Sequence, residues 1–485
     1  MNIQKSVSQL EQFRQAMYEA FDLRRDALME LIDALSSTPD ARSVAELSLS
    51  PFFRREYPSV YDAIACLFQP SEPEKADEER REWEQKWMRL IASYLPEPQE
   101  RKFWLFGIDV VPIPRPFAPT LPDRTFVYQP NAISGNKPVT IGHQYSHLVF
   151  FPEKFNDDDA PWTVPLIVRR IHSDEKATTV GAEQINALMG DETLPFHDEF
   201  CVNVADSTYS AVTHLGPVVK QEHDNLVVVA RSRNNRVFYR QPLPVEGKSG
   251  PGHPTWYGER FDLKDSDTWG DPDEVDEISF TTSNRRHYRV KLEGWHDLLM
   301  TGKREWPMHQ FPFTLIRVRV LDKEGHQVFK RTMWLIVTGK RRHELSIRKT
   351  WEAYGQRYDV EHYFRFGKQR LLERAYQTSD DEHEENWMYI VALTKAQLWL
   401  ARDLAQSLPR PWERHLPEME RKTPGPSFVQ RDFGRIIRQI GTPAQPPKPR
   451  GNSPGRAKGE EQTPRKRHPV IKKGEKAPNR PETAC

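Results

Sequence analysis

The sequence predicts a mixed α/β fold, and three features of the chain indicate it. Short apolar runs that begin near Phe103 are separated by clusters of Pro, Gly and Asn, as between the strands of one sheet. A segment of helix length, 207–224, lies between two of these runs. A later apolar run, "MWLIVTG" at 333–339, precedes a polar segment with helical spacing. Strands and helices that alternate in this way favour a mixed sheet with flanking helices.

Residues 1–98 are expected to form a helical N-terminal domain. Apolar side chains recur there at helical spacing, and a second amphipathic helix, 74–96, ends at Pro96. Between the helices lies the basic and aromatic segment "FFRREYPSVYDAIACLF". Such a segment could bind a DNA end, and an ordinary helical bundle with surface charges is the alternative. The recurring apolar residues are Phe13, Met17, Phe21, Leu28, Leu31 and Leu35.

Residues 99–235 are expected to form the first part of a sheet-containing core. Three strands precede a fourth strand, a helix and a fifth strand, and Pro217 shortens or kinks that helix. The five strand sequences are "KFWLFGIDVVPI", "SHLVFFP", "VPLIVRRI", "FCVNVAD" and "NLVVVARSR". The order of these elements is that of a mixed α/β domain.

The second half of the chain is expected to hold four further parts. Residues 236–330 lose helical periodicity and contain alternating stretches such as "TLIRVRVL", so they predict a β-rich insertion. Residues 331–410 return to the core with one strand, the polar helix and the apolar helix "ENWMYIVALTKAQLWLARDLAQSL". A helical segment, 411–440, follows, and 441–485 is expected to be a disordered tail because it holds nine prolines and no apolar periodicity.

Charge is distributed unevenly along the chain. The net charge is +1, but the segment 441–485 holds 11 Lys and Arg against 4 Asp and Glu, a net +7, which leaves −6 for the rest. A basic tail attached to a slightly acidic body is compatible with DNA binding, and a solvated end without a function is the alternative.

Composition excludes several classes of protein. No apolar run approaches the roughly 20 residues that a membrane-spanning helix needs. The polar start, "MNIQKSVSQLEQFRQ", is no secretory signal. Cys66, Cys201 and Cys485 are far apart and belong to no metal-binding motif, so we expect reduced thiols, no zinc site and a cytoplasmic protein.

The segment "WEAYGQRYDVEHYFRFGKQR", 351–370, concentrates charged and aromatic side chains. If it forms one helix, Tyr354, Arg357, Glu361 and Lys368 share a stripe about 60° wide, with Arg365 close to it. The apolar residues beside that stripe would anchor the helix on a core; they are Val360, Phe364 and Leu371. A carboxylate flanked by cations and a phenol suits a phosphodiester. The alternative is a solvated helix face with ion pairs such as Arg357 with Glu361.

Two further carboxylates follow buried strands. Asp109 comes after "FWLFGI", near the end of the first strand, and Asp206 ends "FCVNVAD". Each alone could be a turn or cap residue. Together with Glu361 they provide the several acids that two-metal phosphoryl transfer requires.

The spacing of Tyr354, Arg357, Glu361 and Lys368, with two, three and six intervening residues, resembles the Tyr-Arg-Glu-Lys signature of DDE transposases in the insertion-sequence-four group. The resemblance covers about residues 100 to 410 and includes the order Asp, Asp, β-rich insertion, Glu. The residues after Asp109 depart from the pattern, because relatives often carry Asp or Thr close after the first catalytic Asp and this chain carries "VVP".

The resemblance implies a ribonuclease-H-like core in which Asp109, Asp206 and Glu361 hold two Mg²⁺ ions, with Mn²⁺ as a possible substitute. It implies that transposon-end phosphates are held by the signature residues Tyr354, Arg357 and Lys368, and we add Arg365 as a DNA contact. Tyr358 is similar to the aromatic residue that helps to manage a flipped base in relatives, with Trp295 or Trp306 as its partner. "RSRNNR", 231–236, is either a non-specific DNA contact or a surface loop without a role.

The function that the resemblance implies is cut-and-paste transposition by a metal-dependent enzyme. Its partners would be double-stranded DNA, as transposon terminal inverted repeats and target DNA, and a second copy of the chain in the DNA complex. Such a protein would be cytoplasmic, of bacterial type, and associated with the nucleoid when bound to DNA. The alternatives are a catalytically inactive DNA-binding relative and a ribonuclease-H-like nuclease that acts on structured DNA.

Overall fold

A computed structural model describes residues 3–129, 137–156, 159–243, 256–281, 286–405, 424–449, 459 and 463–472. The chain divides into two compact units. Unit 1 comprises 1–96, 110–176 and 359–485, and unit 2 comprises 97–109 and 177–358. Strand β1 (Trp104–Pro114) contributes its first part to unit 2 and its second part to unit 1.

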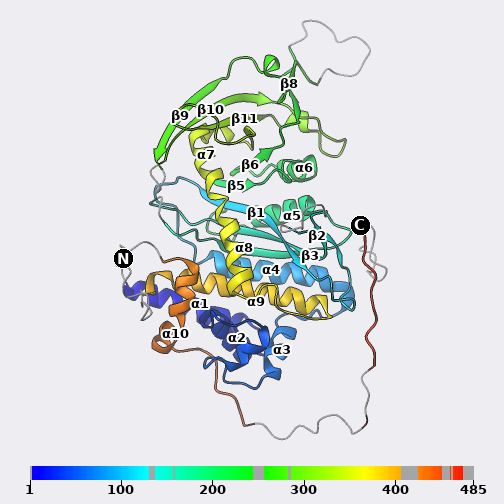
Figure 1. Cartoon of the computed structure of the whole chain (residues 1–485), viewed down its shortest axis with the longest axis vertical. Helices are drawn as coiled ribbons and strands as arrows, with labels where there is room; N and C mark the ends of the chain where they lie inside the picture. Colours follow the sequence, from blue (N-terminus) through cyan, green and yellow to red (C-terminus); the bar gives the residue numbers. More distant parts are fainter. Residues whose placement is uncertain are drawn as a thin grey trace. The chain divides into compact units, whose positions relative to one another are not determined.

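Unit 2 contains a mixed β-sheet (Figure 1). Parallel pairs join β1 to β5 and β5 to β6, whereas the pairs from β6 onward are antiparallel. The order is β1, β5 (Cys201–Ala205), β6 (Leu226–Ser232), β12 (Met333–Thr338), β11 (Phe313–Leu321), β10 (His287–Leu298) and β9 (Glu274–Thr281). The predicted mixed α/β class is confirmed, and the arrangement is consistent with a ribonuclease-H-like fold.

Among the described residues of unit 2 there are three α-helices. Helix α5 (Ala177–Met189) packs against α6 (Val212–Lys220), and α7 (Ile347–Gln356) packs against β5, β9 and β10. Sequence periodicity did not predict α5, because the packing of this helix depends on Gly181, which lies close to Ile108 and Tyr209. A Cβ at Gly181 would lie 2.8 Å from Ile108 Cδ1 and 2.7 Å from Tyr209 Cε1. Only a residue without a side chain fits there.

In the stretch predicted as a β-rich insertion, 236–330, the described residues form five strands. Strands β7 (Val237–Tyr239) and β8 (Arg260–Asp262) form a small antiparallel pair. Strands β9, β10 and β11 instead extend the main sheet through the pairing of β11 with β12. The hydrogen bonds from β11 cover the edge of β12 that would otherwise be open.

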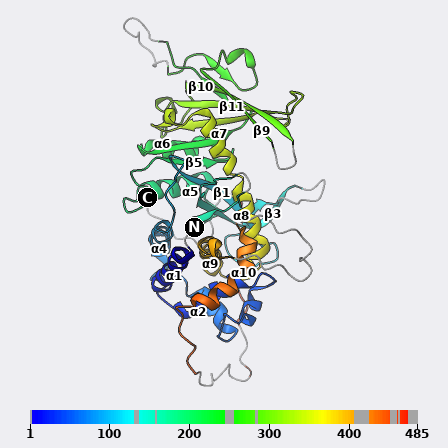
Figure 2. The same cartoon turned by 90° about the vertical axis from the view of Figure 1, so that its left-hand side faces the viewer.

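Unit 1 is built around α9 (Asp381–Leu400), which is buried along most of its length. Three helices that surround it in Figure 2 are α1 (Ile3–Ala20), α2 (Arg25–Ser37) and α10 (Pro426–Ile440). Helix α3 (Pro58–Ala65) also packs against α9, and α4 (Ala76–Ala92) packs against β4. The N-terminal helices therefore share a core with a helix from the second half of the chain. The apolar residues predicted at helical spacing are all buried, from Phe13 to Leu35.

The strands of unit 1 are β2 (Thr125–Tyr128), β3 (Val139–Phe150), β4 (Val164–Ile171) and the second part of β1. Strand β3 pairs antiparallel with β2 and β4. A buried polar cluster ties this sheet to α9. Glu384 accepts hydrogen bonds from Arg115 Nε at 2.5 Å and from the Tyr145 hydroxyl at 2.9 Å, and its Oε2 lies 2.5 Å from His143 Nδ1. These partners explain why a charged residue can lie inside the core.

The single helix predicted over 351–370 is wrong. Helix α7 ends at Gln356, and α8 (Asp359–Arg370) begins after a turn at Arg357 and Tyr358. In that turn the backbone N–H groups of Arg357 and Tyr358 bond to carbonyls three residues back. Tertiary contacts on both sides favour the break: Arg357 pairs with Asp109 in unit 2, and Asp359 pairs with Lys154 in unit 1. Helix propensity is weak enough for such contacts to override it.

The predicted disorder of the tail is wrong for the residues that the structure describes, 441–449, 459 and 463–472. Ala444 and Ile471 are buried, and the Ile471 backbone forms a parallel bridge with Thr125. Hydrogen bonds also hold the described tail residues on unit 1, from the His468 N–H to the Pro119 carbonyl and from the Ile471 N–H to the Arg124 carbonyl. The remaining tail residues, Cys485 among them, and residues 411–423 of the predicted helical segment lie outside the described residues.

Six short 3₁₀ helices complete the described structure, at Val44–Leu49, Pro73–Lys75, Ser266–Thr268, Met308–Gln310, Arg342–Glu344 and Arg402–Leu404. None of the described helices combines the length and apolar character needed to cross a bilayer.

Candidate active site

Two of the predicted carboxylates lie at neighbouring positions in unit 2. In the parallel sheet, Ile108 of β1 pairs with Ala205 of β5. Asp109 and Asp206 are the next residues of the two segments, so they stand side by side at the carboxyl end of this strand pair. The first strand was predicted over 102–113, and β1 covers Trp104–Pro114, so Asp109 lies within the strand at the point where its pairing with β5 ends.

Arg357 pairs with Asp109 and lies close enough to Asp206 to interact with it electrostatically. Its Nη1 lies 3.4 Å from Asp109 Oδ2, and the side chain of Asp109 is 24% exposed. Burial lowers the pKa of the Arg357 guanidinium, but the neighbouring Tyr354, Asp109 and Asp206 more than offset that effect and raise it. The guanidinium is therefore a permanent positive charge that acts on both aspartates.

Asp206 is oriented by its own turn. Its Oδ1 accepts a hydrogen bond from the Thr208 backbone N–H at 2.8 Å, and its Oδ2 accepts one from the Thr208 hydroxyl at 3.3 Å. A carboxylate held in this way has a restricted direction, which suits a ligand that must present an oxygen to a metal ion.

The two tyrosines of the signature segment surround Arg357. Its guanidinium carbon lies 5.6 Å from the Tyr354 ring centroid and 5.0 Å from that of Tyr358. Tyr354 is completely buried, whereas Tyr358 is 40% exposed. Burial raises the pKa of Tyr354, and the charges of Arg357 and Arg231 act in the opposite direction. In this conformation Tyr354 supports Arg357, and Tyr358 is the tyrosine that a base or phosphate can reach.

Three predicted site residues lie in unit 1, on α8. Glu361 and Arg365 are exposed and Lys368 is half-buried, while the residues that anchor the helix, Val360, Phe364 and Leu371, are buried as predicted. The structure therefore brings together Asp109, Asp206, Tyr354, Arg357 and Tyr358 within unit 2, and it places Glu361, Arg365 and Lys368 on the solvent side of a helix of unit 1.

Helix α8 rests on a buried ion pair of unit 1. Lys395 Nζ lies 3.0 Å from Glu373 Oε1 and 3.5 Å from the Tyr363 ring centroid. A Cβ on Gly367 would lie 2.6 Å from Glu373 Oε1 and 2.7 Å from Lys395 Nζ. The missing side chain at Gly367 therefore lets α8 approach the pair, which fixes the helix that carries Glu361 and Lys368.

The two tryptophans considered as partners of a flipped base differ in accessibility. Trp295 is 2% exposed and packs among Phe261, Trp269 and Trp334, so its rings have no free face. Trp306 is half-buried, lies against Gly216 and has Lys303 Nζ at 5.4 Å from its ring centroid. Of the two, only Trp306 offers partly exposed ring surface.

The donor set in unit 2 fits a hard divalent cation. Mg²⁺ prefers carboxylate oxygens, usually from one or two acids, and completes its shell with water and phosphate. Asp109 is partly accessible, Asp206 is held by hydrogen bonds, and Arg357 compensates their charge. Two adjacent acids without a cation would repel each other, so an ion and an arginine both suit this place.

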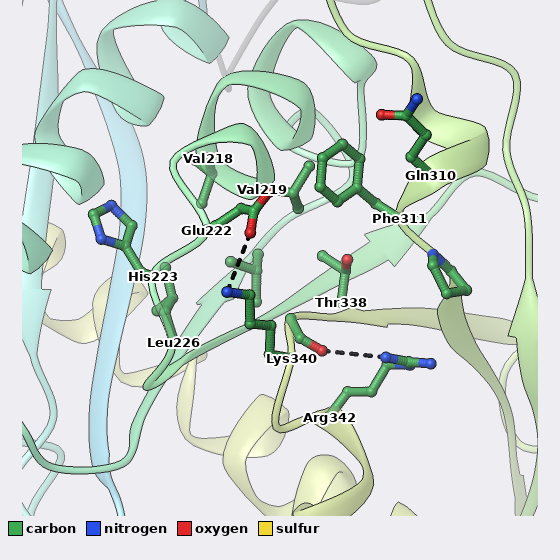
Figure 3. Close-up of a pocket in the computed structure, with 13 residues that line it drawn as sticks. Val218, Val219, Glu222, His223, Leu226, Gln310, Phe311, Thr338, Lys340 and Arg342 are labelled. Carbon is green, nitrogen blue, oxygen red and sulfur yellow. Dashed lines mark hydrogen bonds and ion pairs between the residues drawn. The ribbon is translucent and has the colours of Figure 1, made fainter.

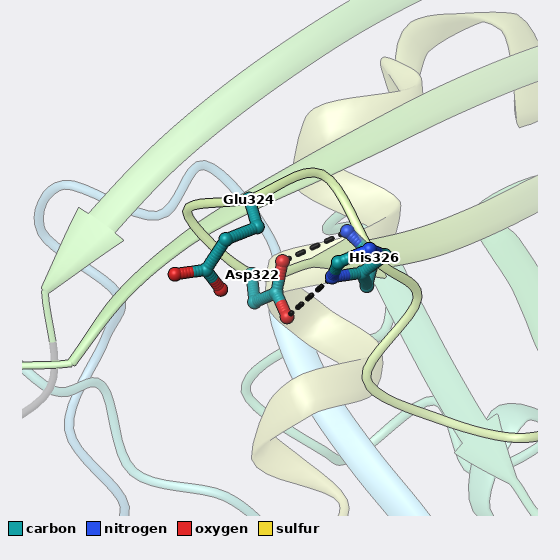
Figure 4. A group of neighbouring side chains, drawn as sticks. All are labelled: Asp322, Glu324 and His326. Carbon is teal, nitrogen blue, oxygen red and sulfur yellow. Dashed lines mark hydrogen bonds and ion pairs between the residues drawn. The ribbon is translucent and has the colours of Figure 1, made fainter.

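Two other features of unit 2 are separate from this group. A pocket beside α6 is lined by Val218, Glu222, Lys340 and Arg342 among others, and an ion pair joins Lys340 to Glu222 at its side (Figure 3). The pocket lies at the end of β6 that is opposite to Arg231. Asp322, Glu324 and His326 form a solvent-facing group on the turn after β11 (Figure 4). Among the described residues, these three are the one set of three or more possible metal ligands whose donor atoms all lie within 4.8 Å of one another.

Comparison with known proteins identifies one family. A family model described as DDE superfamily endonuclease matches residues 16–300, more than half of the chain. The matched region includes both Asp109 and Asp206 and ends before α7. No curated protein matches the sequence.

Proposed function

The chain belongs to the DDE superfamily endonucleases, and from this premise we propose that it is the transposase of an insertion sequence. The family implies a nuclease-type activity on DNA that depends on a divalent metal ion. Transposition, in which the transposon ends are cut and joined to target DNA, is the finer function that we propose.

The observation that carries the proposal is the group formed by Asp109, Asp206 and Arg357. Two carboxylates at the ends of adjacent parallel strands, with an arginine 3.4 Å from one of them, provide ligands for a cation and a donor for a phosphate. The signature spacing around Arg357 supports transposition over other DNA cleavage reactions, because that spacing resembles the insertion-sequence-four group.

We assign the third carboxylate to Glu361. It is exposed on α8 and therefore accessible to a ligand, and the signature places it four residues after Arg357. Arg365 and Lys368 lie on the same helix and are proposed to bind transposon-end phosphates, with Tyr358 placed to stack on a base. Glu361, Asp109 and Asp206 together would hold two Mg²⁺ ions, with Mn²⁺ as a possible substitute.

The residues of this chain have distinct parts in the reaction. Bound divalent ions would activate an attacking water or 3′-hydroxyl and stabilise the leaving oxygen of an in-line displacement at phosphorus. Asp109 and Asp206 would ligate the ions, and the hydrogen bonds that Thr208 donates fix the orientation of the Asp206 carboxylate. Arg357 leaves Asp109 when DNA binds and donates to a phosphate oxygen, which suits its planar fork of N–H groups.

The partners that follow from this function are double-stranded DNA and a second copy of the chain. The DNA would carry terminal inverted repeats and, in the joining step, a target site. Because lysine and arginine side chains displace counterions from DNA, the affinity of the protein for DNA should fall steeply as the salt concentration rises. Synapsis of two transposon ends is the step for which a homodimer is proposed.

A nuclease that acts on structured DNA is the second candidate, since the family description itself names an endonuclease. The two functions are separated by cleavage assays with the full chain and Mg²⁺ on three duplexes. One duplex carries the inverted repeats that flank the gene, one carries a scrambled sequence, and one is branched. Cleavage of the repeat duplex alone supports a transposase; preference for the branched duplex supports a structure-specific nuclease.

Two substitutions test whether the assigned acids perform the reaction. Asp109→Asn and Asp206→Asn should each lower cleavage by about a thousandfold or more, because losing an ion ligand removes several kcal/mol of transition-state stabilisation. DNA binding should remain within about threefold of wild type, since neither change removes a lysine or arginine side chain that contacts phosphate. Full cleavage by either variant would rule out its assigned role, and DNA binding by the wild type without cleavage in Mg²⁺ or Mn²⁺ would favour an inactive DNA-binding relative.

A further inference from the structure

Arg231 extends the row of charged residues at the carboxyl end of the parallel strands. Ala205 of β5 pairs with Ala230 of β6, at the same level at which Ile108 pairs with Ala205. The next residues in the three segments are Asp109, Asp206 and Arg231. Register alone therefore sets two acids and one arginine in a line across β1, β5 and β6.

Arg231 also interacts electrostatically with helix α7. Its positive charge acts on Tyr354 of α7, as does that of Arg357. The same helix packs against β5. Two guanidinium groups thus lie near one tyrosine, and Arg357 is the one that pairs with Asp109. Arg231 belongs to the candidate active site and not to a remote surface loop.

The Arg231 side chain has unused hydrogen-bonding capacity. Within the described part of the chain, no carboxylate lies within 4.0 Å of its guanidinium, and the side chain donates no hydrogen bond. Two other arginines of unit 2 are paired with carboxylates: Arg317 with Glu293 at 3.2 Å and Arg341 with Glu344 at 2.7 Å. Arg231 is half-buried, and none of its nitrogen atoms is buried without a partner, so its N–H donors reach solvent and are available to an anion.

We propose that Arg231 binds a phosphate of the DNA strand that enters the site formed by Asp109 and Asp206. This inference rests on the proposed function and adds a substrate contact that lies outside the Tyr-Arg-Glu-Lys spacing. Arg357 and Arg231 then hold phosphates on the two sides of Asp206. A planar guanidinium can grip two phosphate oxygens at once, which fixes the strand as well as attracting it.

The test measures how DNA affinity depends on salt. The full-length chain, in the absence of divalent ions, is titrated with a labelled duplex at several salt concentrations. Wild type is compared with Arg231→Gln, Arg231→Lys and Arg233→Gln. Arg233 is the matched control, because it is exposed two residues farther along the same segment. Circular dichroism of each variant checks folding, and Arg231→Met, which keeps the aliphatic stem, replaces Arg231→Gln if that variant does not fold.

The loss of one phosphate contact changes the salt dependence of DNA affinity by a known amount. Arg231→Gln should flatten the slope of log affinity against log salt by about 0.9. It should also weaken binding about tenfold at low salt, since hydrogen bonds to charged groups contribute that much. Arg231→Lys should retain most of the slope, and Arg233→Gln should match wild type.

Three results would overturn the inference. The first is an unchanged slope in Arg231→Gln and Arg231→Met. The second is an equal loss in Arg233→Gln, which would show only a general effect of charge. The third is the absence of DNA binding by wild type, which would remove the proposed function as well. In the first two cases wild-type binding and cleavage leave the proposed function standing.

Discussion

The Arg357 guanidinium lies 3.4 Å from the Asp109 carboxylate, and its charge also acts on Asp206. Arg357 and a divalent cation would therefore compete for the same carboxylate oxygens. In a site that binds both metal and DNA, the arginine can hold the acids in place until an ion and a phosphate arrive. This relationship gives opposite expectations for metal binding and for DNA cleavage.

Arg357→Gln should bind Mn²⁺ more tightly than wild type and cleave DNA more slowly. Removing this positive charge makes the electrostatic potential at the two neighbouring acids more negative, which favours a cation. We expect Mn²⁺ affinity to rise about threefold to tenfold and cleavage to fall about a hundredfold, because a phosphate donor is lost. Isothermal titration with Mn²⁺ and a strand-cleavage assay measure the two effects.

Arg348→Gln is a suitable control for that experiment, since Arg348 lies near the start of α7, the helix that ends just before Arg357, but pairs with the half-buried Asp276. It should leave Mn²⁺ affinity unchanged. If Arg357→Gln bound Mn²⁺ more weakly than wild type, Arg357 would not be a competitor of the metal ion.

Two glycines in the signature segment should respond oppositely to alanine. Gly367→Ala places a Cβ 2.6 Å from Glu373 Oε1 and should destabilise the protein by about 1–3 kcal/mol, as overpacking does. Gly355→Ala meets no atom within 4 Å and should stabilise α7 by about 0.5–1 kcal/mol. The urea-unfolding midpoints of the two variants measure the difference. If both substitutions changed stability in the same direction, the close packing of α8 at Gly367 against Glu373 would be contradicted.

Glu384 should make unit 1 sensitive to acid. Burial would raise the pKa of Glu384, but His143, Arg115 and Tyr145 outweigh it and lower the pKa to about 2. Because this value lies below that of an unfolded glutamate, the stabilisation is complete above about pH 4.5 and is lost as the pH falls toward about 2. The contribution is on the order of 3 kcal/mol.

The comparison of wild type with Glu384→Gln tests this dependence. The difference in unfolding free energy should be large near pH about 7 and should shrink near pH about 3, where part of the wild-type contribution has been lost. A difference that stays constant over this range would show that the Glu384 carboxylate is not the titrating group.

The sequence predicted elements with strong periodicity or long apolar runs. The N-terminal helices, the strands that precede Asp109 and Asp206, and the buried face of α8 all follow patterns that depend on neighbours in the chain. Local pattern is sufficient there because burial of one face decides the element. Helix α5 was missed because its packing depends on Gly181 meeting Ile108 of a distant strand.

The candidate site was predicted in part. Asp109 and Asp206 were found because an acid directly after an apolar strand is visible in the sequence. The break between α7 and α8 was not, because it depends on partners of Arg357 and Asp359 that lie far away in the chain. Arg231 was assigned only to a basic loop, because strand order and register decide which residue stands beside Asp206.

The role of Glu361 as a metal ligand is tested most directly by exchanging its ligand atom. Cleavage of a repeat duplex by Glu361→Cys is measured in Mg²⁺ and in Mn²⁺, with Glu352→Cys, on the exposed side of α7, as the control. A thiolate binds Mg²⁺ poorly and accepts softer ions more readily. The account predicts no cleavage in Mg²⁺, partial recovery in Mn²⁺ and normal cleavage by the control in both. Undiminished cleavage by Glu361→Cys in Mg²⁺ would contradict the assignment of Glu361 as the third carboxylate.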